Sequence, residues 1–549
     1  MRGIVARGAS RAMQRHAREM SVPAWADKDP EKLEGDLVCN LVSGEWKLPP
    51  GCTFEEVQDP LNGKPMLRVP LTRGKALQEY AENMHQVPKH GMHNPKKNPE
   101  RYLMYGDVTA NLVAEMRKPE VADYFSKLIQ RVSPKSYVQA MGEVSVTTRF
   151  LENFCGDQVR FLARSFGVPG DHNGQYSNGY RWPYGPVAII TPFNFPLEIP
   201  VLQLMGSLYM GNRPVLKVDS KVSVVMEQML KLMHHCGVPT KDVDFINTGG
   251  AEMNELLMTG NPRTVLFTGS KRVAEKLSAD LRGRLSVEDA GFDWKVLGPD
   301  VPKTEKEIEY VSYVCDQDAY ACSGQKCSAQ SLLFMHKEWT KDGVNLEQRL
   351  AKLASRRELS NLTIGPTLTV TNERTYSHIE KLLKIPGARL AFGGKEIPGH
   401  TIPREYGAML PTAVFVPLDQ ILASQDNFEL VTTEIFGPFQ IITEYVDEDV
   451  PKILQIFEKM DAHLTAGVVS SDPVFVNNFV GQTVNGTTYV GLRARTTGAP
   501  QNHWFGPAGD PRAAGIGTPE AIQKVWSSHR EVISDVGPVA ADWTLPAAS

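Results

Sequence analysis

Apolar and polar positions recur with two different periods along the chain, and the change of period separates its segments. Residues 121–132 and 137–166 carry apolar side chains at three- and four-residue spacing, which predicts two packed helices interrupted near Pro134. Segment 167–182 is rich in Gly, Asn and Ser, and it predicts a loop or hairpin that leaves the body.

After this segment, short apolar runs alternate with helical patterns. Strands are predicted at 187–190, 215–218, 243–246 and 265–267, with helices such as 221–236 and 271–281 between them. A second alternation runs from about residue 331 to 480, with strands expected at 412–416 and 440–443. Strand and helix in turn indicate an α/β fold with parallel, doubly wound sheets in two domains.

Length and charge restrict the class of protein. The 549 residues exceed what one hydrophobic core supports, so two or more domains are expected. The formal net charge is -4 with both signs mixed, which predicts no nucleic-acid partner. No apolar run of about 18 residues or more is present, so no membrane span is predicted. A soluble protein with a small-molecule substrate fits this composition.

The seven cysteines are odd in number and irregularly spaced, which argues against a disulfide framework and favours a reducing compartment. Cys322 and Cys327 have no second Cys or His pair nearby at ligand spacing, so no metal site is predicted.

The first twenty residues differ in composition from the rest of the chain. Their arginines stand against a single acid, Glu19, and four of them recur at a spacing that gathers them on one face of a helix. A continuous apolar region of the kind found in secretion signals is missing. Residues 1–26 therefore predict a flexible mitochondrial transit peptide and a matrix location, and the alternative is a basic tail that targets nothing.

One cysteine lies in a setting that suits covalent chemistry. Cys327 belongs to the run 320–331, where Gly324 and small residues leave its thiol unshielded. A lone cysteine is more often a buried small hydrophobe. Here it is preceded along the chain by Thr-Pro-Phe-Asn-Phe-Pro at 191–196, Phe-Thr-Gly-Ser at 267–270, and Glu288. These motifs, in this order, resemble the aldehyde dehydrogenase family.

The chemistry of that family can be built from these residues. An aldehyde carbon must become tetrahedral before it can lose hydride, and a thiolate such as that of Cys327 is a strong attacker. The resemblance implies that the Asn194 amide and the Cys327 backbone N–H stabilise the oxyanion, and that Glu288 is the general base. The family more commonly has Glu-Leu-Gly-Gly-Lys at 288, so Asp289 is the alternative base. Asp293 is expected at the surface or at a helix start.

The resemblance also implies a dinucleotide site without the usual Gly-x-Gly-x-x-Gly fingerprint, which is missing after Ile190. Lys217 ends a predicted strand and would bind ribose or phosphate, and Ser270 would open a helix toward a pyrophosphate. Taken alone, they would be a solvated strand end and an N-cap. The positions implied for the cofactor are Thr191, Pro192, Phe193, Lys217, Ser220, Gly269, Ser270, Glu434 and Phe436.

The choice of cofactor depends on one of these positions. Many family members carry, three residues after the lysine, a glutamate that repels a 2′-phosphate, whereas this chain has Ser220. NAD is the expected cofactor, and NADP is the alternative.

Three segments, 193–196, 324–329 and 497–510, resemble the plant-type pyrroline-5-carboxylate dehydrogenases, and the similarity extends over about residues 41–538. The resemblance implies NAD-dependent oxidation of glutamate γ-semialdehyde to glutamate in mitochondrial proline catabolism. It also implies that Ser328 and the loop 505–517, from Phe505 and Gly506 onward, anchor the substrate carboxylate. The loop could instead be a structural connection. The alternatives for the activity are another short acid semialdehyde, such as succinate semialdehyde, and a non-catalytic member of the fold.

These expectations combine into a domain plan. Residues 27–289 are predicted to form the NAD-binding domain, with 167–182 as a projecting oligomerisation arm, and 290–518 the catalytic domain. Residues 519–549 would join the arm in the interface of a homodimer or homotetramer.

Overall fold

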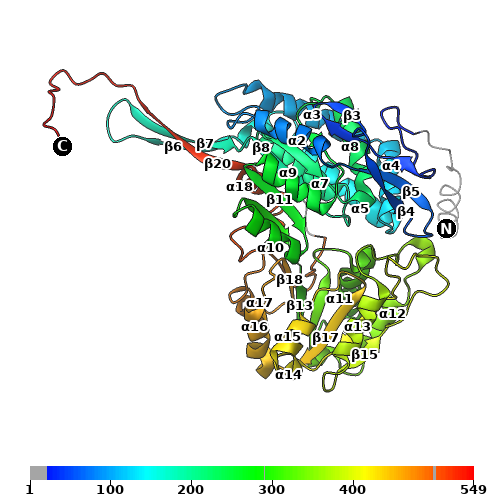
Figure 1. The fold of residues 1–549 in the computed structure, drawn as a ribbon. Coiled ribbons are helices and arrows are strands. Elements are labelled where there is room, and N and C mark those ends of the chain that lie inside the picture. Colours follow the sequence, from blue (N-terminus) through cyan, green and yellow to red (C-terminus); the bar gives the residue numbers. More distant parts are fainter. Residues whose placement is uncertain (1–21, 290, 499–501) are drawn as a thin grey trace, which may run out of the picture.

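The computed structural model describes residues 22–289, 291–498 and 502–549. The transit-peptide prediction falls mostly on residues 1–21, which lie outside the described residues, as does Ala290. The body contains two large sheets with helices around them, and a thin arm projects from one side (Figure 1). None of the described helices is both long and apolar enough to cross a membrane.

The first large sheet has seven strands in the order β12-β11-β8-β9-β10-β2-β3. Its parallel part runs from β12 to β10, and β2 pairs antiparallel with β10. The strands are β12 (Leu285–Asp289), β11 (Thr264–Gly269), β8 (Pro186–Ile190), β9 (Arg213–Lys217), β10 (Asp244–Phe245), β2 (Asn40–Val42) and β3 (Glu45–Lys47). The predicted parallel α/β sheet is confirmed, although the strand expected at 243–246 is only two residues long.

The helices of this part of the chain are α2 (Lys75–Gln86), α3 (Glu100–Met116), α4 (Pro119–Val132), α5 (Tyr137–Glu152), α6 (Gln158–Phe161), α7 (Glu198–Tyr209), α8 (Ser223–His235), α9 (Gly250–Gly260) and α10 (Lys271–Asp280). A small sheet, β1-β5-β4, flanks them. It consists of β1 (Asp36–Leu37), β4 (Thr53–Gln58) and β5 (Pro65–Leu71).

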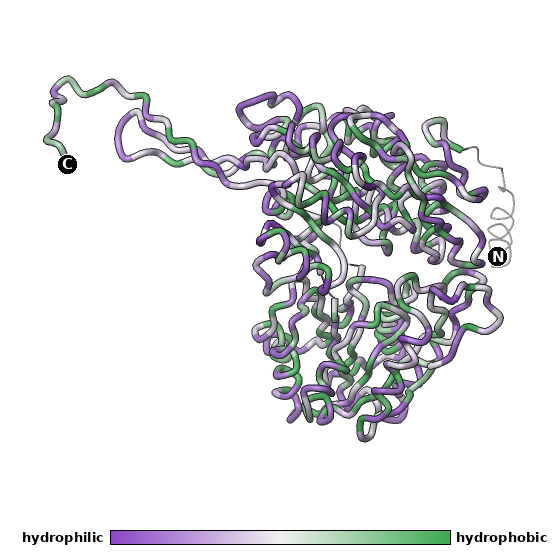
Figure 2. Tube along the Cα trace, viewed as in Figure 1, coloured by the Kyte–Doolittle hydropathy of each residue, from purple (hydrophilic) through white to green (hydrophobic). Residues whose placement is uncertain are grey.

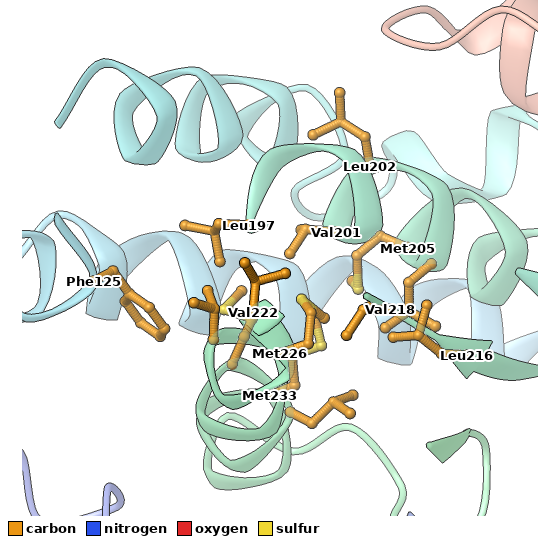
Figure 3. Close-up of a cluster of buried hydrophobic side chains, with 14 of the residues drawn as sticks. Phe125, Leu197, Val201, Leu202, Met205, Leu216, Val218, Val222, Met226 and Met233 are labelled. Atoms are coloured by element: carbon orange, nitrogen blue, oxygen red, sulfur yellow. The ribbon is translucent and has the colours of Figure 1, made fainter. Parts of the chain in front are cut away.

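The core of this domain lies where α7 and α8 pack together. Val201 and Met205 of α7 approach Val222 and Met226, and Phe125 of α4 closes one end of the cluster (Figure 3). These side chains are fully buried. Burial of each contributes about 1.5–3 kcal/mol, so the cluster fixes α7, whose N-terminus begins next to Asn194.

The second large sheet has the order β15-β16-β17-β14-β13-β18-β19 and is parallel except for β15. Its strands are β13 (Asp293–Leu297), β14 (Gln330–His336), β15 (Arg389–Phe392), β16 (Thr412–Phe415), β17 (Phe439–Tyr445), β18 (Thr465–Val469) and β19 (Thr487–Val490). The strands predicted at 412–416 and 440–443 are therefore confirmed.

The helices around this sheet are α11 (Glu305–Tyr320), α12 (Leu346–Ala354), α13 (Asn372–Leu382), α14 (Leu418–Ile421), α15 (Gln425–Val431), α16 (Val450–Lys459) and α17 (Pro473–Val480).

One predicted helix is wrong in its second half. Helix α5 ends at Glu152 rather than at residue 166, and residues 164–169 form strand β6 (Arg164–Pro169). Gly156 has a φ of 61°, a conformation that ends the helical path. Phe166, the last residue of the predicted helix, is exposed on the strand, as is Val168.

The arm is a three-stranded antiparallel sheet in the order β20-β7-β6. Strand β20 (Ser527–Asp535) follows α18 (Pro519–Trp526) and pairs along its whole length with β7 (Gln175–Pro183). The arm and the C-terminal tail carry hydrophobic stretches outside the body (Figure 2). The sequence thus brings residues 164–183 and the C-terminal segment together in one projecting element.

Candidate active site

Cys327 lies in a backbone turn that is held from several sides. Helix α11 ends in a 3₁₀ turn in which Cys322 and Ser323 have left-handed φ values of 55° and 57°. The Ser323 hydroxyl accepts a hydrogen bond from the backbone N–H of Gly365 over 2.9 Å. The Gln325 side-chain carbonyl accepts one from the N–H of Leu368 over 2.7 Å. Such a strained turn persists only where neighbouring groups hold it, so the Cys327 thiol has a defined position.

Glu288 lies near Cys327 but belongs to the domain of the first large sheet. It belongs to β12, is buried, and lies close enough to Cys327 for its charge to raise the pKa of the thiol. Gly291 explains the close approach of the two segments, because a Cβ atom at this position would overlap the carbonyl oxygen of Cys327. Asp289, the alternative base, belongs to the same strand.

The electrostatics of the site keep the thiol protonated at rest. Burial raises the pKa of Cys327 well above its usual value, and the charges of Glu288 and Asp293 raise it further. Attack by the sulfur therefore requires a proton acceptor, and the Glu288 carboxylate is in contact with the thiol.

Asp293 is not at the surface, so that prediction is wrong. It begins β13 and is fully buried, and its carboxylate accepts hydrogen bonds of 2.7 Å from both the N–H and the hydroxyl of Thr465. Burial raises the pKa of its carboxyl well above the usual value. An aspartate two positions after a glycine resembles a surface or loop residue in sequence, whereas here it starts an interior strand.

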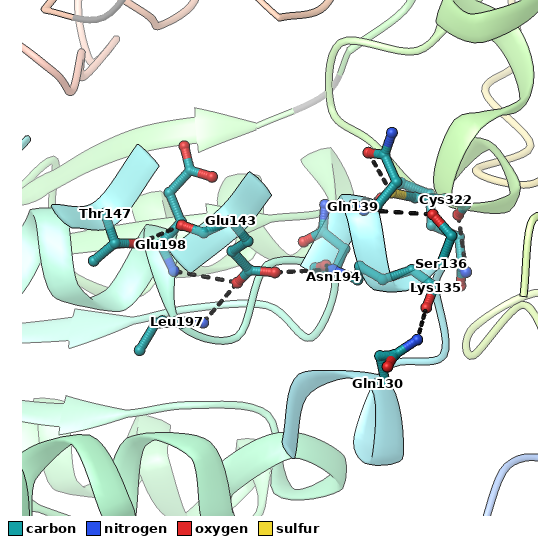
Figure 4. A network of polar contacts seen from close by, with 11 residues as sticks. Gln130, Lys135, Ser136, Gln139, Glu143, Thr147, Asn194, Leu197, Glu198 and Cys322 are labelled. Carbon is teal, nitrogen blue, oxygen red and sulfur yellow. Dashed lines mark hydrogen bonds and ion pairs between the residues drawn. The ribbon is translucent and has the colours of Figure 1, made fainter. Parts of the chain in front are cut away.

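A buried polar network orients Asn194, as Figure 4 shows. The Lys135 ammonium donates to the Asn194 backbone carbonyl over 2.6 Å and pairs with the Glu143 carboxylate at 3.0 Å. Glu143 also accepts from the N–H of Leu197 over 2.8 Å. The Asn194 amide nitrogen donates one hydrogen to the carbonyl of Gln325 over 3.1 Å, and its second hydrogen stays available for an oxyanion.

Two cavities meet at Cys327 and Glu288, which line both of them. The first, of about 530 Å³, lies beyond the carboxyl ends of β8, β9 and β11. The second, of about 280 Å³, lies between α5, α7 and the loop that follows Thr497. The Cys327 thiol can therefore attack a molecule bound in one cavity while a second reactant is bound in the other.

The first cavity contains almost all the positions predicted for the cofactor. Its walls include Thr191, Pro192, Phe193, Lys217, Gly269, Ser270, Glu434 and Phe436. Ser220 is not among its lining residues. It begins a 3₁₀ turn, and the preceding Asp219 lines the cavity instead.

These residues suit a dinucleotide. Lys217 ends β9 beside the last residue of β8, and Ser270 precedes the N-terminus of α10, so an ammonium and helical N–H groups face one cavity. The buried Thr191 hydroxyl has no partner among the described residues and can bind a polar ligand atom. The walls also supply a carboxylate and an aromatic ring from the second domain, Glu434 and Phe436. Together these groups match phosphate, ribose and a flat ring.

On the other side of the thiol, the structure places Ser328 and Phe505 in the wall of the second cavity, but not Gly506. The backbone N–H of Phe505 donates to the carbonyl of Ile516 over 3.0 Å, and the reverse bond measures 2.7 Å. Phe505 therefore offers its ring to the cavity and not its amide. Gly506 packs against the backbone of Ala514, where a Cβ atom would have no room.

Comparison with known proteins agrees with this geometry. The family model described as the aldehyde dehydrogenase family matches residues 51–524. The chain belongs to the aldehyde dehydrogenase family. Delta-1-pyrroline-5-carboxylate dehydrogenase 12A1, mitochondrial, from Arabidopsis thaliana is 61% identical over 96% of this chain and 94% of that protein. A 1-pyrroline-5-carboxylate dehydrogenase from Bacillus subtilis is 25% identical over 72% of this chain and 74% of its own length.

Solved aldehyde dehydrogenase structures share the fold. A betaine aldehyde dehydrogenase from Staphylococcus aureus, solved in complex with NAD⁺, superposes with a TM-score of 0.77 at 15% identity. The match covers 94% of this chain and all of that one. The predicted fold class is thereby confirmed.

Sequence reasoning missed two acidic residues of this aldehyde dehydrogenase site. Asp219 lines the first cavity and Glu198 the second. A signal for Glu198 exists in the sequence, because it is the only charged residue of the apolar helix α7. Asp219 follows the strand-end lysine by two positions rather than three, so matching by spacing passed over it.

Proposed function

We propose that this aldehyde dehydrogenase oxidises L-glutamate γ-semialdehyde, the open form of 1-pyrroline-5-carboxylate, to glutamate with NAD. The observation that carries the proposal is the 61% identity, over nearly the full length of both chains, to the Arabidopsis enzyme named for pyrroline-5-carboxylate. The name of that relative also supports a place in mitochondrial proline catabolism and a matrix location.

The first half of the reaction uses Cys327, Glu288 and Asn194. As the Cys327 sulfur bonds to the aldehyde carbon, the Glu288 carboxylate accepts the thiol proton. The aldehyde oxygen becomes an oxyanion that meets the Asn194 amide and the backbone N–H of Cys327, which donates to no carbonyl of the described residues. Loss of one such donor typically costs about 100- to 1000-fold in rate.

NAD, when bound in the first cavity, supplies the acceptor for the hydride that the aldehyde carbon loses. Oxidation leaves the acyl group on Cys327 as a thioester. Glu288 first releases the thiol proton to solvent, which restores its carboxylate, and then accepts a proton from the water that attacks the thioester carbon. The Cys327 sulfur departs as a thiolate as glutamate forms. Because Glu288 is buried next to the sulfur, it is placed to receive the proton in both halves of the reaction.

The choice of NAD over NADP is supported by Asp219. Its carboxylate lines the dinucleotide cavity two residues after Lys217, where a negative charge would repel a 2′-phosphate. It also caps the turn at Ser220 by accepting from the N–H of Lys221 over 3.0 Å, which holds the carboxylate in place.

The arm supports a homo-oligomer. Phe166, Val168 and Ile533 are exposed on it, and Val536 follows it in the tail. Exposed apolar side chains on a projecting sheet favour contact with a second copy of the chain.

The proposal is tested by measuring NAD reduction with glutamate γ-semialdehyde, succinate semialdehyde and hexanal. We expect the highest kcat/KM with glutamate γ-semialdehyde, because groups that meet a charged substrate end are left unpaired by an apolar one. Equal efficiency with hexanal, or a clear preference for succinate semialdehyde, would overturn the assignment.

A further inference from the structure

Glu198 is the acidic residue that the reaction scheme above does not use. It begins α7, four residues after Asn194, and its side chain lines the substrate cavity together with Cys327 and Ser328. Every other residue of α7 is uncharged, and most are fully buried. A carboxylate at this position costs free energy on folding, because a buried charge without a partner is less favourable than an apolar side chain.

The Glu198 carboxylate makes no hydrogen bond or ion pair with any other described residue. Its backbone N–H donates to the Glu143 carboxylate over 3.2 Å. Figure 4 shows the two carboxylates pointing in different directions, with the side chain of Glu198 directed away from the network around Lys135. Acids are favoured in the first turn of a helix, where Glu198 lies, but this carboxylate accepts no hydrogen bond from that turn and so leaves its oxygens free for a ligand.

The surroundings make an ionised Glu198 costly when the cavity is empty. Burial and, to a smaller extent, the charge of Glu143 raise the pKa of Glu198 to about 8, although Lys135 and Lys326 partly offset both. Lys135 is committed to Glu143, with which it forms a buried pair. A cation that enters the cavity would therefore find a carboxylate without a partner.

We propose that the Glu198 carboxylate binds the α-ammonium group of the substrate and so selects an amino-acid semialdehyde over the same chain without the amine. The inference rests on the proposed function and assigns a residue to the substrate's positive charge. Ser328 and Lys326 line the same cavity and are available to the carboxylate on the same carbon atom. The ammonium and the carboxylate on one carbon atom of the substrate would then face Glu198 and Lys326, respectively, in the cavity wall.

The test compares glutamate γ-semialdehyde with 5-oxopentanoate, which has the same length and the same carboxylate but no ammonium. In Glu198→Gln the preference for glutamate γ-semialdehyde, measured as the ratio of kcat/KM values, should fall by about 10- to 100-fold, as for the loss of a hydrogen bond to a charged group. This fall should come from a higher KM for glutamate γ-semialdehyde. The kcat for 5-oxopentanoate should stay unchanged. Glu255→Gln, on the exposed side of α9, removes the same charge far from the cavity and should leave the substrate preference unchanged.

The outcomes separate the two proposals. A wild-type enzyme that prefers glutamate γ-semialdehyde, with a Glu198→Gln variant that keeps this preference, would overturn the role of Glu198 and leave the proposed function intact. A wild-type enzyme that does not oxidise glutamate γ-semialdehyde would overturn the proposed function itself. Equal loss of kcat on both substrates in the variant would contradict ammonium binding and indicate a part in proton transfer.

A second measurement does not depend on the variant being folded. Glutamate and glutarate differ only in the ammonium group, and both are compared as inhibitors of the wild-type enzyme. Glutamate should inhibit about tenfold or more strongly than glutarate. Equal inhibition by the two acids would contradict an ammonium site in this cavity.

Discussion

Asp219 and Glu198 are the two carboxylates to which we assign the selectivity of the two cavities. Both lie within a few residues of a predicted site residue, and neither matches the position that the family pattern suggested. Their roles depend on where the backbone directs the side chain, which spacing alone does not determine. At this scale the candidates for nucleophile, oxyanion amide and base could be named from sequence, whereas the two acids in the cavity walls could not.

Replacing Asp219 by Asn should weaken the discrimination against NADP. The amide oxygen can still accept from the N–H of Lys221, so the turn is kept while the negative charge is removed. We expect kcat/KM for NADP to rise by about tenfold relative to NAD, since like-charge contacts cost several kcal/mol when close. Asp171→Asn, at an exposed position of the arm, serves as the matched control. An unchanged ratio would show that Asp219 does not face the ribose.

Inhibition by glutamate should depend on pH through Glu198. The pKa of this carboxyl is raised to about 8, so below that pH the free site is protonated and must lose a proton to bind an ammonium. Glutamate affinity should therefore rise with pH, by up to about tenfold per unit, and level off above pH 8. Glu143, Lys135, Lys326 and Glu288 also act on this group, so the Glu198→Gln variant is the reference. The dependence should vanish in that variant, and its persistence would assign the titration elsewhere.

At the scale of elements, segments with a regular apolar pattern were predictable. Segments in which apolar residues are exposed or an acid is buried were not. The strands of both parallel sheets appear as buried apolar runs, and they were found for that reason. The extension of α5 to residue 166 was wrong because the apolar residues of β6 face solvent. Asp293 was misplaced because a buried acid with two bonds to Thr465 resembles a surface acid in sequence.

Gly291 lies between β12 and β13 and packs against the backbone of Cys327, which allows a direct test of that contact. In Gly291→Ala the new Cβ would overlap the Cys327 carbonyl, so the turn must shift. A displacement of about 1 Å can reduce kcat/KM by about 100-fold, and the strain should lower the free energy of unfolding by about 1–3 kcal/mol. Gly250→Ala introduces the same group where nothing lies within 4 Å and should be neutral. Full activity in Gly291→Ala would contradict the described approach of the two segments.

At the scale of the whole molecule, two α/β domains place their reactive groups against each other, and the arm extends beyond both (Figure 1). The change from the first sheet to the second comes between β12 and β13, on either side of Gly291. Glu288 and Cys327, which come from different domains, are thus brought together only when both domains are folded. The motifs in the sequence predicted that these two residues act at one site. That two cavities both reach Cys327 could be seen only in the structure.

The arm should control the oligomeric state. Ile533 is 67% exposed on β20, and an aspartate there would place a charge in an apolar contact between copies. Light scattering after gel filtration should give an oligomer for the wild type and a smaller species for Ile533→Asp. Val474→Asp, at a position of α17 that is 74% exposed, should leave the mass unchanged. A monomeric wild-type protein would rule out the arm as an interface.

The most direct test of the central claim is to trap the acyl group on the enzyme. The protein is mixed with NAD and glutamate γ-semialdehyde, quenched in acid within one turnover, digested and examined by mass spectrometry. We expect a glutamyl adduct on the peptide that contains Cys327 in the wild type and in Cys322→Ser, and neither adduct nor NADH in Cys327→Ser. An adduct on Cys322, or NADH formation by Cys327→Ser, would contradict the account.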